Sequence, residues 1–107
     1  MKHAMKIALT GNLFDAQTAL EYGLINQIVE KKYFVRECKI MLDTILECSP
    51  MSLRASKEMI HKGLTASSIK EAFELNYPEH AKMISSYDAL EGSKAFIEKR
   101  TPIWQGR

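Results

Sequence analysis

The sequence contains no apolar run that approaches the roughly 20 residues needed to cross a lipid bilayer. Its first residues also lack the apolar core and the cleavage pattern of a signal peptide. The two cysteines, Cys38 and Cys48, stand ten positions apart, a spacing that matches no tight metal motif. In a chain that is not secreted we expect them to be small buried apolar side chains or free thiols. These absences predict a cytoplasmic protein with no membrane partner.

An excess of one charge is also missing, because 15 basic and 13 acidic residues leave a formal net charge of only +2. The charges are interspersed, so a nucleic-acid partner is not expected. The composition, 46% hydrophobic and 26% charged, is that of a folded globular segment, and 107 residues give room for one core. Internal repeats, low-complexity tracts and flexible linkers are absent. We therefore predict a single domain over residues 1–107.

The first part of the chain is predicted to be a short helix–glycine–extended unit. Residues Leu9–Asn12 have the character of the last turns of a helix. Asp15 can cap a second helix, Ala16–Tyr22, by accepting a hydrogen bond from one of its free amides. Gly23 suits the left-handed conformation that ends such a helix. The run Leu24–Val29 is short and partly β-branched, so we expect it to be extended or to form the only strand.

Two longer helices are predicted in the middle of the chain. Apolar residues recur every three or four positions over Tyr33–Glu47, which is the period of an amphipathic helix. Ser49 and Pro50 mark a stop and a new start, because serine caps a helix and proline at the first helical position loses no hydrogen bond. The second helix is predicted over residues 51–61, ending at Gly63.

The next segment is predicted to be helical with an interruption. Ser67 or Ser68 can cap it, with Glu71 placed for a capping box behind Ser68. Pro78 removes one backbone hydrogen bond and clashes with the carbonyl four residues earlier, so we expect a kinked helix or two short ones. His80 lies on an otherwise apolar face, where a structural histidine bonded to the backbone is favoured over a catalytic one.

The last helix has the clearest local signal in the chain. Asp88 and Glu91, three positions apart, predict a capping box that satisfies the free amides at its start. The helix should continue to Lys99, and Pro102 cannot extend it. The remainder is predicted to be a tail that Trp104 and Tyr87 anchor against the body of the protein or against a partner.

Small residues gather on one side of this last helix, at Ala89, Gly92 and Ser93. A glycine inside a helix costs about 1 kcal/mol relative to alanine, so we expect another group to approach closely there. That group is either a ligand or a partner helix. The partner helix is the plainer interpretation.

The polar residues do not predict a catalytic centre. The glutamates are scattered and mostly fall on polar faces or caps, where carboxyl pKa values stay ordinary. The three histidines, His3, His61 and His80, are too dispersed to predict a metal site. No serine or cysteine has an adjacent histidine pattern that would indicate a nucleophile. We therefore assign no catalytic residue and no metal to this chain.

Three groups of motifs nevertheless follow one another in a specific order. The first group is Leu9-Thr10-Gly11, Asp15-Ala16 with Ala19, Gly23–Asn26 and Ile28-Val29, and the second is Ser49-Pro50 with Lys57. The last group is Asp88, Glu91-Gly92, Ala95-Phe96, Glu98–Arg100 and Pro102. In this order and spacing they resemble the C-terminal helical segment of the enoyl-CoA hydratase/isomerase (crotonase) superfamily. The resemblance implies a mainly α fold with at most one short strand. It also implies contacts to neighbouring subunits, commonly in trimers or pairs of trimers.

The same resemblance implies what this chain does not contain. Family members hold an acyl-CoA thioester in an N-terminal spiral core, and their acid–base glutamates lie upstream of the segment that matches Leu9–Gly11. We therefore expect that core to be absent and the chain to be inactive alone. Its parent activity would be that of a hydratase or isomerase of fatty-acid-type acyl-CoA metabolism. No separate cofactor is expected, since CoA is part of the substrate.

Phe96, Lys99 and Arg100 are the candidate CoA-binding residues. Helical residues three and four apart share a face, and an aromatic ring beside cations suits an adenine with its phosphates. The resemblance implies that Phe96 and Lys99 contact the adenine end of CoA, often from the adjacent subunit. From the residues alone, a core phenylalanine beside a solvated helix end is the favoured explanation, and only the family resemblance makes CoA binding the better one. For the whole chain, the alternative is a helical interaction module that binds no nucleotide.

Overall fold

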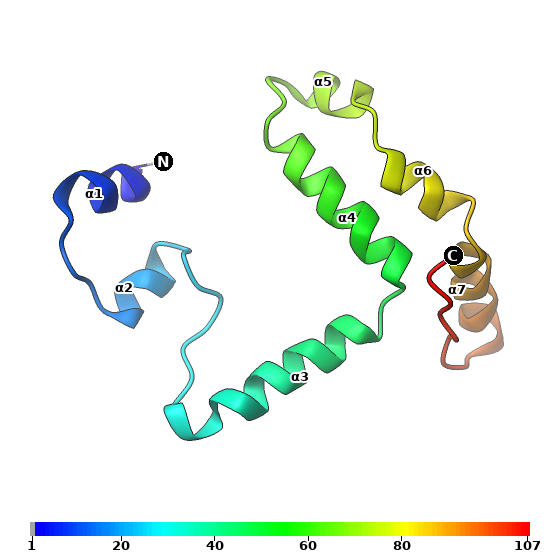
Figure 1. The fold of residues 1–107 in the computed structure, drawn as a ribbon, viewed down its shortest axis with the longest axis horizontal. Helices are drawn as coiled ribbons and strands as arrows, with labels where there is room; N and C mark the ends of the chain where they lie inside the picture. Colours follow the sequence, from blue (N-terminus) through cyan, green and yellow to red (C-terminus); the bar gives the residue numbers. More distant parts are fainter. Residues whose placement is uncertain (1) are drawn as a thin grey trace. The chain divides into compact units, whose positions relative to one another are not determined.

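The computed structural model describes residues 2–107 as a series of helices joined by short connections (Figure 1). No strand occurs within this range, so the run after Gly23 is irregular, and the prediction of a mainly α fold is confirmed. None of the described helices is long and apolar enough to cross a membrane. The chain divides into two compact units, Met1–Ile40 and Met41–Arg107, which are described separately. That residues 1–107 form one domain stays a prediction.

The first unit is organised by local caps and one aromatic cluster. Asp15 caps the second helix as predicted, because its carboxylate accepts the backbone N–H of Thr18 at 2.8 Å. Gly23 ends the turn after that helix with a φ of +71°. The ring of Tyr22 stacks on His3, with ring centroids 4.0 Å apart. The elements of this unit are α1 (Lys2–Thr10), α2 (Ala16–Glu21), η1 (Lys31–Tyr33) and the first part of α3 (Phe34–Leu46).

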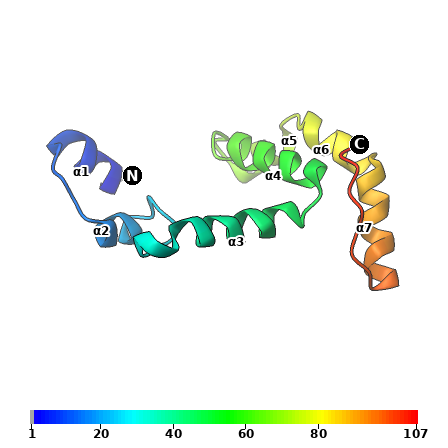
Figure 2. The same cartoon turned by 60° about the horizontal axis from the view of Figure 1, so that its bottom comes forward.

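In the second unit, α4 and α6 run side by side (Figures 1 and 2). Glu58 of α4 joins them, accepting the Glu79 backbone N–H and the Lys62 ammonium, each at 2.8 Å. Ser49 caps α4 with Pro50 at its first position, and Pro78 starts a separate short helix, both as predicted. The elements are the remainder of α3, α4 (Pro50–Gly63), α5 (Ile69–Glu74), α6 (Pro78–Ile84) and α7 (Tyr87–Glu98).

The start of α7 differs from the prediction. Ser86 is the cap, since its hydroxyl accepts the backbone N–H of Ala89 at 3.1 Å. Asp88 falls inside the first turn and is buried, while Glu91 bonds the segment that follows the helix. The predicted capping box at Asp88 and Glu91 is therefore wrong. A serine two residues earlier offers the same capping chemistry and leaves both carboxylates available for longer-range bonds.

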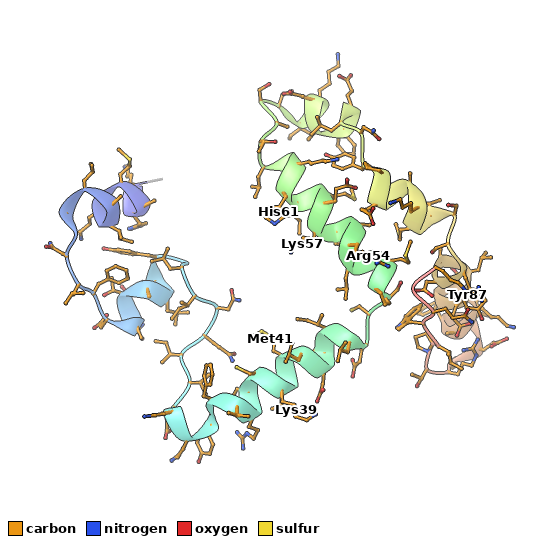
Figure 3. All side chains as sticks on the ribbon, viewed as in Figure 1. Lys39, Met41, Arg54, Lys57, His61 and Tyr87 are labelled. Carbon is orange, nitrogen blue, oxygen red and sulfur yellow. The ribbon has the colours of Figure 1, made fainter. Side chains whose placement is uncertain are left out.

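Little apolar surface is buried within the described residues. The buried apolar residues are Met51 and Ala55 of α4 and Ala95 of α7. No residue of α3 is buried, although its apolar side chains recur at helical spacing, and Met41, labelled in Figure 3, is among the exposed ones. Amphipathic helices gain most of their stability by burying the apolar face. The helices of this chain thus have exposed apolar faces that would be stabilised by packing against another protein surface.

Candidate functional site

The last helix ends in a tight left-handed turn at Lys99. This residue has a φ of +53° and is the only non-glycine residue with a positive φ between positions 2 and 107. The N–H groups of Lys99 and Arg100 donate to the carbonyls of Phe96 (3.3 Å) and Ala95 (3.1 Å), the pattern of a Schellman C-cap. Glycine usually occupies this position, because a Cβ crowds the backbone there. The surroundings must therefore hold the lysine in place.

The three predicted CoA-binding residues differ in their surroundings and in their contacts. The Phe96 ring is 86% exposed on α7. The Lys99 ammonium makes no hydrogen bond or ion pair with any part of the chain that the structure describes. Arg100, in contrast, turns back onto Glu91. Both cations lie beyond the last residue of α7, so helical spacing does not govern where they point.

Glu91 is the residue that fixes Arg100. Its carboxylate, in a residue only 6% exposed, forms a two-pronged ion pair with the guanidinium at 2.6 and 3.0 Å. It also accepts the backbone N–H of Ile103 at 2.8 Å. The hydrogen bonds from Arg100, followed by that from Ile103, lower the pKa of Glu91 to about 2. Glu91 in turn raises the pKa of Arg100, so both groups are charged at neutral pH.

Asp88 holds the end of the tail. Its buried carboxylate accepts the backbone N–H groups of Gln105 (2.8 Å) and Gly106 (3.1 Å) and the hydroxyl of Ser49 (2.8 Å). Burial alone would raise the pKa of Asp88, but these hydrogen bonds outweigh it and hold the pKa below its usual value. Arg54, labelled on α4 in Figure 3, adds a bond to the Gly106 carbonyl at 3.3 Å. The tail is thereby tied to α4 as well as to α7.

Trp104 fills the space beside Gly92. Its indole N–H donates to the carbonyl of Glu47 at 2.8 Å, and a Cβ on Gly92 would lie 3.3 Å from the indole Cη2. Figure 2 shows the tail running along α7 back toward the start of that helix. The expected close approach at Gly92 is real, but the interpretation as a partner helix is wrong. The approaching group is the chain's own tail, and Trp104 anchors it as predicted.

Lys99 and Arg100 are among the residues that line an open cleft of about 810 Å³. Residues at the end of α3 and Trp104 of the tail also line it. Within residues 2–107, no group of three histidine, cysteine or acidic side chains is placed to hold a metal ion. The cleft is lined by Asp43, Leu46, Glu47, Lys99, Arg100, Thr101, Pro102 and Trp104.

The sequence as a whole matches known proteins along its entire length. Residues 1–107 match the family model described as enoyl-CoA hydratase/isomerase. The chain belongs to this family. Carnitinyl-CoA dehydratase of Proteus mirabilis is 34% identical over 109 residues, which cover 95% of this chain and 40% of that relative. The family predicted from the order of motifs is thus confirmed.

Solved structures of the enoyl-CoA hydratase/isomerase family share the fold. An enoyl-CoA hydratase/isomerase from Mycobacterium paratuberculosis is 33% identical with a TM-score of 0.88, covering 100% of this chain and 42% of that one. A probable one from Mycobacterium abscessus is 35% identical with a TM-score of 0.86, covering 99% and 42%. The chain therefore spans about two fifths of the length of its relatives and corresponds to the C-terminal helical part of their fold.

At low pH, the C-terminal tail after Glu98 is expected to detach from α7 in this enoyl-CoA hydratase/isomerase family member. The pKa of Glu91 falls from an ordinary 4.5 to about 2 on folding, and that of Asp88 is also lowered. Unfolding therefore takes up protons, so the stabilisation is complete above pH 4.5 and is lost as the pH falls through about 2. Trp104 is the only tryptophan, and its fluorescence should report tail release in this window. A signal that stays constant down to about pH 2 would contradict the assignment.

Proposed function

We propose that this chain forms the C-terminal helical part of an acyl-CoA-acting hydratase or isomerase, in which it supplies oligomer contacts and a contact to CoA. Membership of the enoyl-CoA hydratase/isomerase family supports the substrate class. The observation that carries the CoA contact is the end of α7, where an exposed aromatic ring, Phe96, precedes an unpaired cation, Lys99. Within the described chain, neither the Phe96 ring nor the Lys99 ammonium makes a contact that would explain why that side chain is there.

The chemistry of the two side chains fits the adenosine end of CoA. A nucleobase stacked on an exposed aromatic ring gains about 1–3 kcal/mol, and an ammonium forms charge-assisted hydrogen bonds to a phosphate. Phe96 and Lys99 would make the direct contacts. Arg100, the third proposed contact residue, adds positive charge at the same turn. CoA would enter as part of the substrate, so no separate cofactor is proposed.

Catalytic groups are proposed to come from outside this chain. Asp88 and Glu91 are the buried carboxylates of the described part, and both have lowered pKa values. A carboxylate held ionised by donors is a poor general acid or base near neutral pH. Hydration or isomerisation through a stabilised thioester enolate would therefore depend on the remaining part of the family fold. Alone, the chain is expected to be inactive.

Assembly is the second half of the proposal. The apolar side chains exposed on α3 include Phe34, Leu42 and Leu46. Large apolar side chains exposed at helical spacing on one helix are a feature of protein interfaces. We propose that further copies of the chain cover part of this exposed surface of α3, in trimer-type contacts. The same surface also favours the alternative function, a helical interaction module without CoA binding.

Titration calorimetry with CoA tests the function. Phe96→Ala and Lys99→Ala are each expected to weaken CoA binding about tenfold, or 1.4 kcal/mol, because each removes one direct contact. Phe73→Ala and Lys70→Ala remove an equally exposed ring and a solvated cation from α5, and should leave the affinity unchanged. Sedimentation velocity on the same samples should give a multiple of the 12.2 kDa chain mass.

The outcomes separate the two functions. Binding that both Phe96→Ala and Lys99→Ala leave unchanged would remove the proposed CoA site. A chain that sediments as a multiple of 12.2 kDa but gives no heat with CoA would support the interaction module instead. A chain that stays monomeric would contradict the proposed assembly.

A further inference from the structure

The conformation of Lys99 needs an explanation that its own contacts do not supply. A lysine at a φ of +53° is strained, whereas glycine or asparagine takes this position easily. Its ammonium has no partner among residues 2–107 that would compensate. Strained residues of this kind persist where the surroundings enforce them, and they gather at functional sites.

The surroundings that enforce this turn are the Arg100 guanidinium and the Glu91 carboxylate. Arg100 directly follows the strained residue, and all three of its nitrogens are engaged. Nη1 and Nη2 bond Glu91 at 2.6 and 3.0 Å, and Nε bonds Glu98 at 2.6 Å. Glu91 also holds the chain three residues further on, through the Ile103 N–H at 2.8 Å. The turn at Lys99 is thus bridged by bonds that join Glu91 and Glu98, which precede it, to Arg100 and Ile103, which follow it.

We propose that Glu91 and Arg100 are positioning residues, which hold the Lys99 ammonium where it meets a phosphate group of CoA. This inference rests on the proposed function and adds to it. A bidentate carboxylate–guanidinium pair has a defined geometry, so it orders the turn before the ligand arrives. Ordering a binding group in advance removes part of the entropy lost on binding. Arg100 therefore acts mainly through Lys99, because its own donors are already occupied.

Glu91→Gln tests the inference, because it keeps the size of the side chain and removes the charge that holds Arg100. CoA affinity is measured by calorimetry at low and high salt, since salt weakens a charge contact to phosphate much more than it weakens the stacking of a base on a ring. We expect Glu91→Gln to weaken CoA binding about fivefold and to reduce the salt dependence, as Lys99→Ala does. The double variant Glu91→Gln with Lys99→Ala should bind CoA no more weakly than Lys99→Ala alone, because both substitutions remove the same contact.

Glu71→Gln is the matched control. Glu71 is also a carboxylate with a pKa lowered by hydrogen bonds, here from Ser67, but it lies on α5. Its substitution should change neither the affinity nor the salt dependence. Arg100→Lys is the second variant, which keeps the positive charge and loses the two-pronged geometry. It should resemble Glu91→Gln, and it replaces that variant if circular dichroism shows that Glu91→Gln does not fold.

The inference and the proposed function fail in different ways. If the unsubstituted chain does not bind CoA, or if Lys99→Ala binds normally, the proposed function falls and the inference with it. If Lys99→Ala loses affinity while Glu91→Gln and Arg100→Lys keep it, the inference alone is overturned. Losses that add in the double variant would also overturn it, because they indicate a general structural role. The inference is also overturned if neither Glu91→Gln nor Arg100→Lys folds.

Discussion

Replacing Asp88 by alanine is expected to lower the free energy of unfolding by about 3 kcal/mol and to release the C-terminal tail. The carboxylate is 2% exposed and accepts hydrogen bonds from Gln105, Gly106 and Ser49. Alanine removes all of these at once and leaves the donors in a partly buried site without an acceptor. Urea denaturation followed by circular dichroism measures the loss, and Trp104 fluorescence reports the position of the tail.

Two further variants test whether the loss of stability in Asp88→Ala comes from the hydrogen bonds of its carboxylate. Asp88→Asn keeps the size and one acceptor oxygen, so a smaller loss of about 1 kcal/mol is expected. Glu74→Ala removes a carboxylate that is 66% exposed and should change stability by less than about 0.5 kcal/mol. If Asp88→Ala is no less stable than Glu74→Ala, the carboxylate does not hold the tail.

Gly92→Val is expected to displace Trp104 and to cost about 2 kcal/mol of unfolding free energy. Even the first added carbon would lie 3.3 Å from Cη2 and 3.5 Å from Cζ3 of the indole, and valine adds two methyl groups beyond it. The indole must then move, which breaks its 2.8 Å bond to the Glu47 carbonyl. Fluorescence should shift toward that of a solvated tryptophan, and denaturation should show the lower stability.

Gly63→Val is the control for the glycine substitution. Gly63 is also helical, at the end of α4, but no atom lies within 4 Å of the Cβ that it would gain. Its substitution should change stability by less than about 0.5 kcal/mol and leave the fluorescence unchanged. Equal effects of the two substitutions would show that a general intolerance to valine, rather than contact with the indole, limits residue 92.

The sequence predicted those parts of the fold that depend on neighbouring residues. Asp15, Ser49 and Pro78 act within one helical turn, and each marks the helix boundary that it was expected to mark. At Asp88 the same kind of reasoning failed, because an acid followed three residues later by a glutamate fits a capping box and also fits a pair of tail-binding carboxylates. Ser86, two positions earlier, was the better cap.

For the candidate site, the sequence predicted a set of residues, and their arrangement came only from the structure. Phe96, Lys99 and Arg100 were predicted from residue type and family resemblance, and their role in binding CoA stays a prediction. The placement of the two cations on the helical face assumed that α7 continues past Glu98, whereas the chain turns at Lys99. Glu91 was missed as the partner of Arg100, although the two charges, nine residues apart, both belong to the motif that identified the family.

By itself the sequence determined the helical class, most helix boundaries and the family, because these follow from short-range hydrogen bonding and from the order of motifs. Only the tertiary structure decided which groups meet Asp88, Glu91 and Gly92. Most of their partners lie in the tail, 9 to 18 residues further along the chain, and Asp88 also meets Ser49, 39 residues earlier. Residue spacing fixes what shares a helix face, but the path of the chain after a helix ends depends on packing and on which buried polar groups must be satisfied.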